Sequence, residues 1–229
     1  MQAGATARWR FKGPEMEGPV ARWYARARSS GSQIEEYRKQ AAQLTEGLPA
    51  GAKVLEVAPG PGYLAVEIAR LGFQVTGLDI SHTFVQIGRE HARQAGVFVD
   101  FRQGDAAVMP FDADSFDLIV CQAAFKNFVY PASALDEMYR VLRGGGTAVI
   151  QDMSSEASHA AINLEVQKMH LGWWSTFSTT ATLEMLKRRA YSPARFQQLA
   201  AESPFHACEI SAEGTGLEVR LKKTEAAVA

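Results

Sequence analysis

The chain has 229 residues, an apolar content of 47% and a formal net charge of −1. This length suits one compact domain with a modest appendage, and the near-zero charge favours small-molecule partners over DNA or RNA. Apolar runs are too short for a membrane span, and the first residues lack a secretory signal pattern. Two distant cysteines, Cys121 and Cys208, predict a reduced, cytoplasmic setting, and the spacing of His, Cys and acidic residues predicts no metal site.

After a loosely attached start, residues 17–30 and 32–48 have the pattern of two helices. Strands and helices then alternate. Strands are predicted at 53–58, 74–79, 99–105, 116–122 and 147–153, and helices at 63–72, 81–96 and 132–143, with a glycine turn at 144–146 leading into the fifth strand. Residues 154–190 read as helical, followed by a helix at 192–203 and a hairpin at 206–223.

This alternation predicts an α/β fold of the Rossmann-like, doubly wound kind. Its seven-stranded sheet would be mostly parallel and would end in an antiparallel C-terminal hairpin. Residues 49–153 and 191–229 are expected to form the core, residues 1–48 an N-terminal helical cover, and residues 154–190 a helical lid inserted into the core.

The segment "GPGYLA", Gly60 to Ala65, matches the nucleotide-binding pattern G-x-G-x-x-[GA] between a strand and a helix. Asp79 ends the next strand about 20 residues later, where an acid can bind ribose hydroxyls. Two ligands stay open at this point, a dinucleotide and S-adenosylmethionine. Glu56 would repel a pyrophosphate and Pro61 removes a backbone donor, so both residues favour S-adenosylmethionine modestly.

Five segments in order strengthen this choice: "VLEVAPGPG", "VTGLDIS", "GDAAVMPF", "FDLIVCQAAF" and "ALDEMYRVLRGGGTAVI". Over residues 33–150 the chain resembles the class I S-adenosylmethionine-dependent methyltransferases. The resemblance implies S-adenosylmethionine as cofactor, S-adenosylhomocysteine as product and no metal. Ala58 and Gly144 depart from the family pattern, which usually has glycine and proline there.

The resemblance also implies roles for individual residues. Glu56, Ala58, Gly60 and Gly62 would surround the methionine moiety, Asp79 would bind the ribose and Ile80 the adenine face. The adenine would be contacted by Asp105 and the Ala106 backbone, and the ligand's ammonium by backbone groups of the strand at Cys121 and Gln122.

The sequence says less about the residues that would bind the methyl acceptor. "AFKNF", residues 124–128, resembles the F-G-L-R-N-V segment of quinone-ring C-methyltransferases and makes Lys126 and Asn127 catalytic candidates. The alternative is that Lys126 is a solvated surface residue and that Asn127 caps a helix. His170, a third catalytic candidate, shares a helix face with Trp173 and Phe177. These aromatic residues, with Trp174 and Tyr24, are expected to bind the substrate, although ordinary packing of a helix gives the same pattern.

We therefore expect in-line transfer of a methyl group to a small, cyclic, oxygenated or ionisable acceptor. Strand four lacks the [DN]-PP-[YF] signature of amide or adenine N-methylation. One alternative is a nicotinamide-dependent oxidoreductase, although the chain has no Tyr-x-x-x-Lys pair for hydride chemistry. The other is a non-catalytic protein that binds S-adenosylmethionine.

Overall fold

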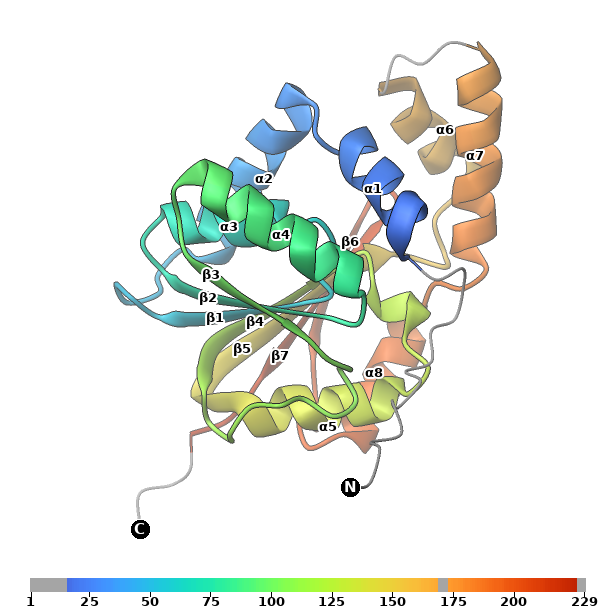
Figure 1. Ribbon diagram of the computed structural model, residues 1–229. Helices are drawn as coiled ribbons and strands as arrows, with labels where there is room; N and C mark the ends of the chain where they lie inside the picture. The colour runs from blue at the N-terminus through green and yellow to red at the C-terminus, as the bar shows by residue number, and fades with distance from the viewer. Residues whose placement is uncertain (1–15, 169–172, 226–229) are drawn as a thin grey trace, which may run out of the picture.

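The computed structural model describes residues 16–168 and 173–225, and within them seven strands form one sheet. Their order is β3-β2-β1-β4-β5-β7-β6 (Figure 1). The strands are β1 (Lys53–Val57), β2 (Gln74–Asp79), β3 (Val99–Gln103), β4 (Phe116–Gln122), β5 (Leu142–Met153), β6 (Glu209–Glu213) and β7 (Gly216–Lys222). Strands β1 to β5 are parallel, and β7 is antiparallel to both β5 and β6. The predicted fold class is confirmed.

Helices cover both faces of this sheet (Figure 1). On one face α3 packs on β2 and on α2, and α4 packs on β3 and on α1; on the other face α5 packs on β5 and α8 on β7. The helices are α1 (Gly18–Ala27), α2 (Gly31–Leu44), α3 (Tyr63–Arg70), α4 (His82–Ala95), α5 (Pro131–Val141), α6 (His159–Lys168), α7 (Trp173–Lys187) and α8 (Pro193–Glu202). Each face buries its own apolar cluster, as the helix patterns require.

The glycines at 144–146 lie inside β5, whereas the sequence predicted a turn before the strand. The pairing of β4 with β5 shifts register between Phe116 and Leu118, so the glycines form a bulge there. Gly145 has φ +79°, and a Cβ on Gly146 would lie 2.9 Å from the Asp117 carbonyl oxygen. Glycine is therefore required by close backbone approach at this bulge.

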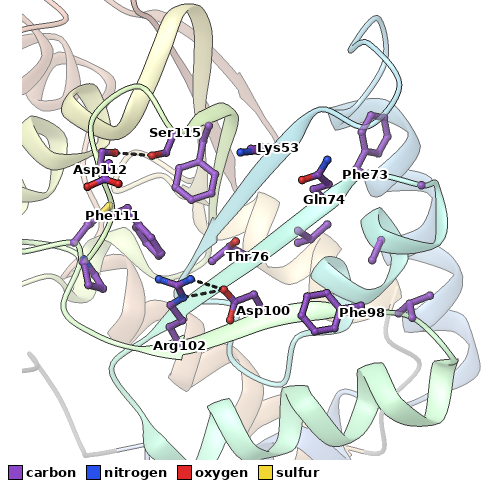
Figure 2. A pocket seen from close by; sticks show the side chains of 17 residues that line it. Lys53, Phe73, Gln74, Thr76, Phe98, Asp100, Arg102, Phe111, Asp112 and Ser115 are labelled. Carbon is purple, nitrogen blue, oxygen red and sulfur yellow. Dashed lines mark hydrogen bonds and ion pairs between the residues drawn. The ribbon is translucent and has the colours of Figure 1, made fainter.

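No helix lies between β3 and β4 in the described chain, and this leaves one face of β2 and β3 open. A cavity of about 880 Å³ lies against that face (Figure 2). Arg102 pairs with Asp100 at 2.7 Å and stacks over the ring of Phe111, 5.3 Å from its centroid. None of the predicted site residues lines this cavity. This cavity arises because no helix lies between β3 and β4 in the described chain, and it is separate from the predicted site.

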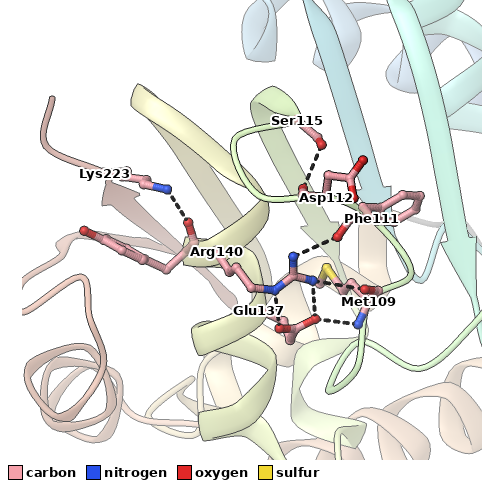
Figure 3. A network of polar contacts seen from close by, with 8 residues as sticks. Met109, Phe111, Asp112, Ser115, Glu137, Arg140 and Lys223 are labelled. Carbon is pink, nitrogen blue, oxygen red and sulfur yellow. Dashed lines mark hydrogen bonds and ion pairs between the residues drawn. The ribbon is translucent and has the colours of Figure 1, made fainter. Parts of the chain in front are cut away.

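The loop that replaces this helix is held by a polar clamp from α5 (Figure 3). The Arg140 guanidinium donates to the carbonyl oxygens of Met109 at 3.0 Å and Phe111 at 2.7 Å. Glu137 pairs with Arg140 at 2.7 Å and accepts from the Met109 N–H at 2.6 Å. The clamp fixes residues 109–111, the end of the segment "GDAAVMPF", which also contains Asp105 and Ala106.

In the described part of the chain, no helix has the length and apolar character needed to cross a membrane.

Candidate functional site

A cavity of about 1020 Å³ opens where β1, β2, β4 and β5 end, as expected for a parallel sheet. Helices α1, α2 and α7 and the loop after β3 complete its walls. Eleven residues predicted for the site line it: Tyr24, Glu56, Ala58, Gly60, Asp79, Ile80, Asp105, Ala106, Gln122, Lys126 and Asn127.

The loop after β1 is shaped by residues in the left-handed backbone region. Ala58 has φ +56° and donates its N–H to the Leu78 carbonyl at 2.8 Å, which joins β1 to β2. Gly60 has φ +55°, and a Cβ there would have no heavy atom within 4 Å. The loop therefore has open space above Gly60, and it holds a non-glycine residue at Ala58 in a conformation that costs roughly 1 kcal/mol.

Gly62 does not line the cavity. It is the N-cap of α3, and a Cβ there would lie 2.5 Å from the ring of Phe101. A Cβ at Gly77 or Gly88 would lie 2.6 or 2.8 Å from the same ring. These three glycines make room for Phe101 beneath α3 and α4. Packing explains the glycine at this position, and its predicted contact with the methionine moiety stays a prediction.

Cys121 also lies outside the cavity lining, although Gln122 beside it is part of it. The Cys121 side chain is fully buried in the apolar cluster under α5, and burial raises the pKa of its thiol well above the usual range. Successive side chains of a strand point to opposite faces, so only one of these two neighbours can face the cavity. Of these two neighbours only Gln122 lines the cavity, and the predicted contact of their backbone groups with the ligand's ammonium stays a prediction.

Asp79 ties two loops together at the carboxyl end of β2. Its carboxylate accepts from the Gly60 N–H at 2.9 Å and from the Ser81 N–H at 2.8 Å. Burial raises the pKa of Asp79 to about 6, and these two donors oppose the rise. Asp79 thus has a structural role that the sequence pattern did not indicate.

Glu56 is the most unusual group in the cavity wall. Its side chain is buried, and Oε2 has no hydrogen-bond partner in the described structure. Burial raises the pKa of Glu56 to about 8; the Ala65 N–H opposes the rise and the Asp79 charge adds to it. A buried, unpaired acceptor is costly, so this oxygen is suited to a ligand that brings a donor or a positive charge.

The segment after β3 is fixed by backbone contacts. Asp105 accepts from the Ala107 N–H at 2.9 Å, and the Gly104 N–H donates to the Asp79 carbonyl at 2.9 Å. Gln103 donates to the Ile80 carbonyl at 3.1 Å. The predicted adenine-side residues Ile80, Asp105 and Ala106 are therefore brought to one part of the cavity.

Lys126 lies in a short 3-10 helix, η1 (Phe125–Asn127), directly after β4. Its ammonium contacts Asp152 Oδ1 at 2.6 Å and the Ala123 carbonyl at 2.7 Å. The side chains of Lys126 and Asp152 are only 6% and 3% exposed to solvent. The alternative of a solvated lysine is therefore wrong. Asp152 also accepts from the Lys126 N–H at 3.0 Å. Sequence reasoning missed Asp152, although an acid near the end of β5, beside β4, was a usable signal.

Asn127 lines the cavity and is not a helix cap, because α5 has Tyr130 at its N-cap position. On the opposite wall, Tyr24 of α1 packs edge-on against Phe84 of α4, with 5.9 Å between ring centroids. Asn127 and Tyr24 both line the cavity, and their roles toward the substrate stay predictions.

Of the remaining predicted residues, His170 lies outside the described residues. Trp173, Trp174 and Phe177 belong to α7, but the placement of their side chains lies outside the described structure as well. The following part of α7 does reach the cavity, through Leu183, Met185 and Leu186.

Within residues 16–168 and 173–225, no group of three or more His, Cys, Asp or Glu side chains is arranged to hold a metal ion.

Residues 55–150 match a family model described as a methyltransferase domain. A demethylmenaquinone methyltransferase of Clavibacter sepedonicus is 38% identical over 107 residues, 46% of this chain and 43% of that protein. A ubiquinone biosynthesis O-methyltransferase of Xanthomonas axonopodis pv. citri is 34% identical over 107 residues, 46% of this chain and 45% of that protein. The matched segment thus spans less than half the length of these relatives.

A crystal structure of a candidate S-adenosyl-L-methionine-dependent methyltransferase from Methanococcus maripaludis is similar in fold over almost the whole chain. Its TM-score is 0.70 at 20% identity, covering 95% of this chain and 98% of that one. The sheet order, the cavity at the strand ends and these matches agree with one another. Residues 55–150 therefore carry a methyltransferase domain with local similarity to quinone methyltransferases, and the solved structure extends the likeness in fold to almost the whole chain.

Proposed function

We propose that the chain is a methyltransferase that moves the methyl group of S-adenosylmethionine to a small, cyclic, oxygenated or ionisable acceptor. The observation that carries the proposal is the unpaired Oε2 of Glu56 in the cavity wall. When bound, the cofactor supplies an electrophilic methyl group on a sulfonium sulfur.

The cofactor half of the proposal is supported by charge. Glu56 and Asp79 both line the cavity, and burial raises the pKa of each. A ligand with an ammonium group gives Glu56 the donor it lacks and favours its ionised form. A pyrophosphate would instead add negative charge beside two buried carboxyl groups. This argues against the nicotinamide-dependent alternative.

Asp79 is suited to ribose hydroxyls as acceptor, and Ile80, Asp105 and Ala106 lie around the adenine position that the family resemblance implies. Gly60, with open space above it, allows the methionine end to approach the loop backbone. No base is needed to move the methyl itself, so the main task of the chain is to hold an acceptor atom roughly 3 Å from it, in line with the leaving sulfur.

For the acceptor, we infer roles for Lys126 and Asn127. An ammonium has three N–H donors, and Asp152 and the Ala123 carbonyl engage two of them. The third can donate to an oxygen of the acceptor, and the Asn127 amide can orient a neighbouring carbonyl or hydroxyl. The quinone methyltransferases among the relatives support a cyclic, oxygenated acceptor. Carbon and oxygen both stay open as the methylated atom.

We further propose that residues 154–190 act as a lid, with residues 1–48 covering the other side. The support is that α7 and α1 contribute Leu186, Met185, Trp23 and Tyr24 to one cavity. Trp173→Ala and Phe177→Ala are then expected to weaken acceptor binding or turnover while cofactor affinity stays within a few-fold. A lower melting temperature with normal kinetics would indicate packing alone.

The test of the cofactor is calorimetric titration of the ligand-free protein with S-adenosylmethionine, S-adenosylhomocysteine and NAD. We expect the first two to bind and NAD not to bind. Asp79→Ala is expected to lose about a hundredfold in affinity, because the ribose loses a charged acceptor. Since Asp79 also holds Gly60 and Ser81, a thermal melt must show that the variant is folded. Preferential binding of NAD would refute the proposal, and a turnover assay separates an enzyme from a protein that only binds.

A further inference from the structure

A ladder of polar side chains crosses three neighbouring strands at the cavity. Gln122, Gln151 and Glu218 lie directly opposite one another on β4, β5 and β7. The Gln122 amide nitrogen donates to Gln151 Oε1, and it also donates to Oε1 of Gln40 on α2 at 3.2 Å. The three glutamines line the cavity. Gln122 is therefore the centre of this polar ladder, which joins α2 to the sheet.

The two ends of the polar ladder fix the direction of its hydrogen bonds. At one end the Gln40 amide nitrogen donates to Glu36 Oε1 at 3.3 Å. At the other end the Gln151 amide nitrogen donates to Glu218 Oε2 at 2.7 Å. A carboxylate only accepts hydrogen bonds, so Gln40 and Gln151 each turn the amide nitrogen to a carboxylate and the oxygen to Gln122. Gln122 must then use its nitrogen toward both neighbours.

The Gln122 amide has one atom left for a ligand. Both of its N–H donors are engaged, and no group in residues 16–168 and 173–225 donates to its Oε1. The side chain is half-buried and lines the cavity. Gln122 therefore offers the cavity a hydrogen-bond acceptor and no donor, in an orientation that the carboxylates at both ends of the polar ladder hold.

We propose that Gln122 is a specificity-determining residue that selects methyl acceptors with an O–H or N–H donor over those with only carbonyl or ether oxygens. This inference rests on the proposed function and narrows its class of acceptor. A carbonyl or ether oxygen beside Oε1 would bring two hydrogen-bond acceptors together and leave both unpaired, which costs more than a single lost contact. A hydroxyl or amino group on the ring supplies the missing donor.

The cofactor is another source of N–H and O–H donors, but the place of the polar ladder in the sheet favours the methyl acceptor. The loops that we assign to the cofactor follow β1, β2 and β3, whereas the polar ladder runs from β4 to β7, on the other side of β1. Gln151 directly precedes Asp152, which pairs with Lys126 at 2.6 Å. The polar ladder therefore runs beside the lysine that we assign to the acceptor.

The test compares two probes with the same ring: 2-naphthol has an O–H donor, and 2-methoxynaphthalene keeps the oxygen but has no donor. Calorimetry with saturating S-adenosylhomocysteine is run on wild type, Gln122→Met, Glu218→Gln and the control Glu209→Gln, which changes an exposed carboxylate on β6. We expect wild type to prefer the naphthol, and Gln122→Met to lower this preference about 5- to 10-fold, the usual range for a neutral hydrogen bond. Glu218→Gln lets the Gln151 amide turn over, so it should lower the preference by a smaller factor. Glu209→Gln should match wild type.

A wild type that does not prefer the naphthol would overturn the inference, and so would an unchanged preference in a folded Gln122→Met. If Gln122→Met weakened S-adenosylhomocysteine and left the preference unchanged, the oxygen would serve the cofactor and the inference would fall. An unchanged preference in Glu218→Gln, with a normal thermal melt, would overturn the role of the polar ladder in holding the amide. If wild type did not bind S-adenosylhomocysteine, the proposed function itself would fall, which distinguishes that failure from a wrong role for Gln122.

Discussion

Glu56→Gln is expected to make the ligand-free protein more stable at alkaline pH. The amide has nearly the same shape and can still accept from the Ala65 N–H, but it never ionises. In wild type, burial raises the Glu56 pKa from 4.5 to about 8. Each pKa unit between the folded and unfolded states corresponds to about 1.4 kcal/mol, so burying the ionised group costs about 5 kcal/mol once the pH exceeds 8.

The direction of the pH dependence follows from proton binding. Below pH 4.5 the carboxyl group is protonated in both the folded and unfolded chain, and stability does not depend on it. Between pH 4.5 and about 8 the folded chain keeps a proton that the unfolded chain has released, so the free energy of unfolding falls as pH rises. Burial also raises the pKa of Asp79, from 3.8 to about 6, so this residue makes the free energy of unfolding fall with rising pH as well, at lower pH than Glu56 does.

The assay is urea denaturation of ligand-free protein at pH 5, 6, 7, 8 and 9 and constant ionic strength. Between pH 5 and pH 9 the free energy of unfolding of wild type should fall by about 4 kcal/mol more than that of Glu56→Gln. Glu35→Gln, an exposed change on α2, should follow wild type. Saturating S-adenosylhomocysteine should reduce the wild-type decline, because an ammonium beside Glu56 lowers its pKa. Parallel profiles for wild type and Glu56→Gln would refute the reasoning.

Three further predictions address other parts of the site. Lys126→Met should destabilise the protein by about 3–5 kcal/mol, because it leaves the Asp152 carboxylate buried and unpaired, and Lys126→Met with Asp152→Asn should recover much of this loss in thermal and urea denaturation. Arg140→Ala should lower S-adenosylhomocysteine affinity several-fold and speed amide hydrogen exchange in residues 104–111, because the clamp on that loop is lost. Ala58→Gly should raise the melting temperature by about 2–4 °C, because glycine relieves a left-handed alanine worth roughly 1 kcal/mol.

Each of these three predictions can be checked against a second variant. If the double variant of Lys126 and Asp152 is stable yet turns over slowly, Lys126 acts on the acceptor; if it is stable and fully active, the lysine is structural only. Arg93→Ala, which removes an exposed pair on α4, should leave loop exchange unchanged. A glycine at Ala65, inside α3, should destabilise, and a destabilised Ala58→Gly would show that the loop gains nothing from glycine.

The fold followed from local patterns because each strand–helix unit has its own apolar period and its own turn residues. The C-terminal hairpin was also readable, since Gly214 and Gly216 flank its turn. The bulge at Gly144–Gly146 was not, because the same glycines fit a free turn equally well, and only the pairing of β4 with β5 decides between the two. Boundaries set by tertiary contacts are invisible to a one-dimensional pattern.

The cofactor side was predictable for a similar reason: its residues follow strand ends, and strand ends of a parallel sheet converge. The packing of Gly62 against Phe101 was not predictable, because a glycine in a ligand loop and a glycine under a phenylalanine ring look the same in sequence. Asp152 was missed because its importance comes from what it faces, a buried lysine. The cytoplasmic setting and the absence of nucleic-acid partners stay predictions.

The position of β7 has a consequence for the synthesis of the protein. This strand lies between β5 and β6, so residues 216–222, which leave the ribosome after β1 to β6, fill an interior place in the sheet. Until then the nascent chain can pair β1 to β5, but β5 has an open edge that carries Ala148, Val149 and Ile150, all fully or almost fully buried in the finished sheet. Such an edge invites pairing with other chains. Translation that pauses before residue 216, or a truncation there, therefore favours aggregation over folding, and yield in cells depends on how fast residues 216–222 follow the earlier strands.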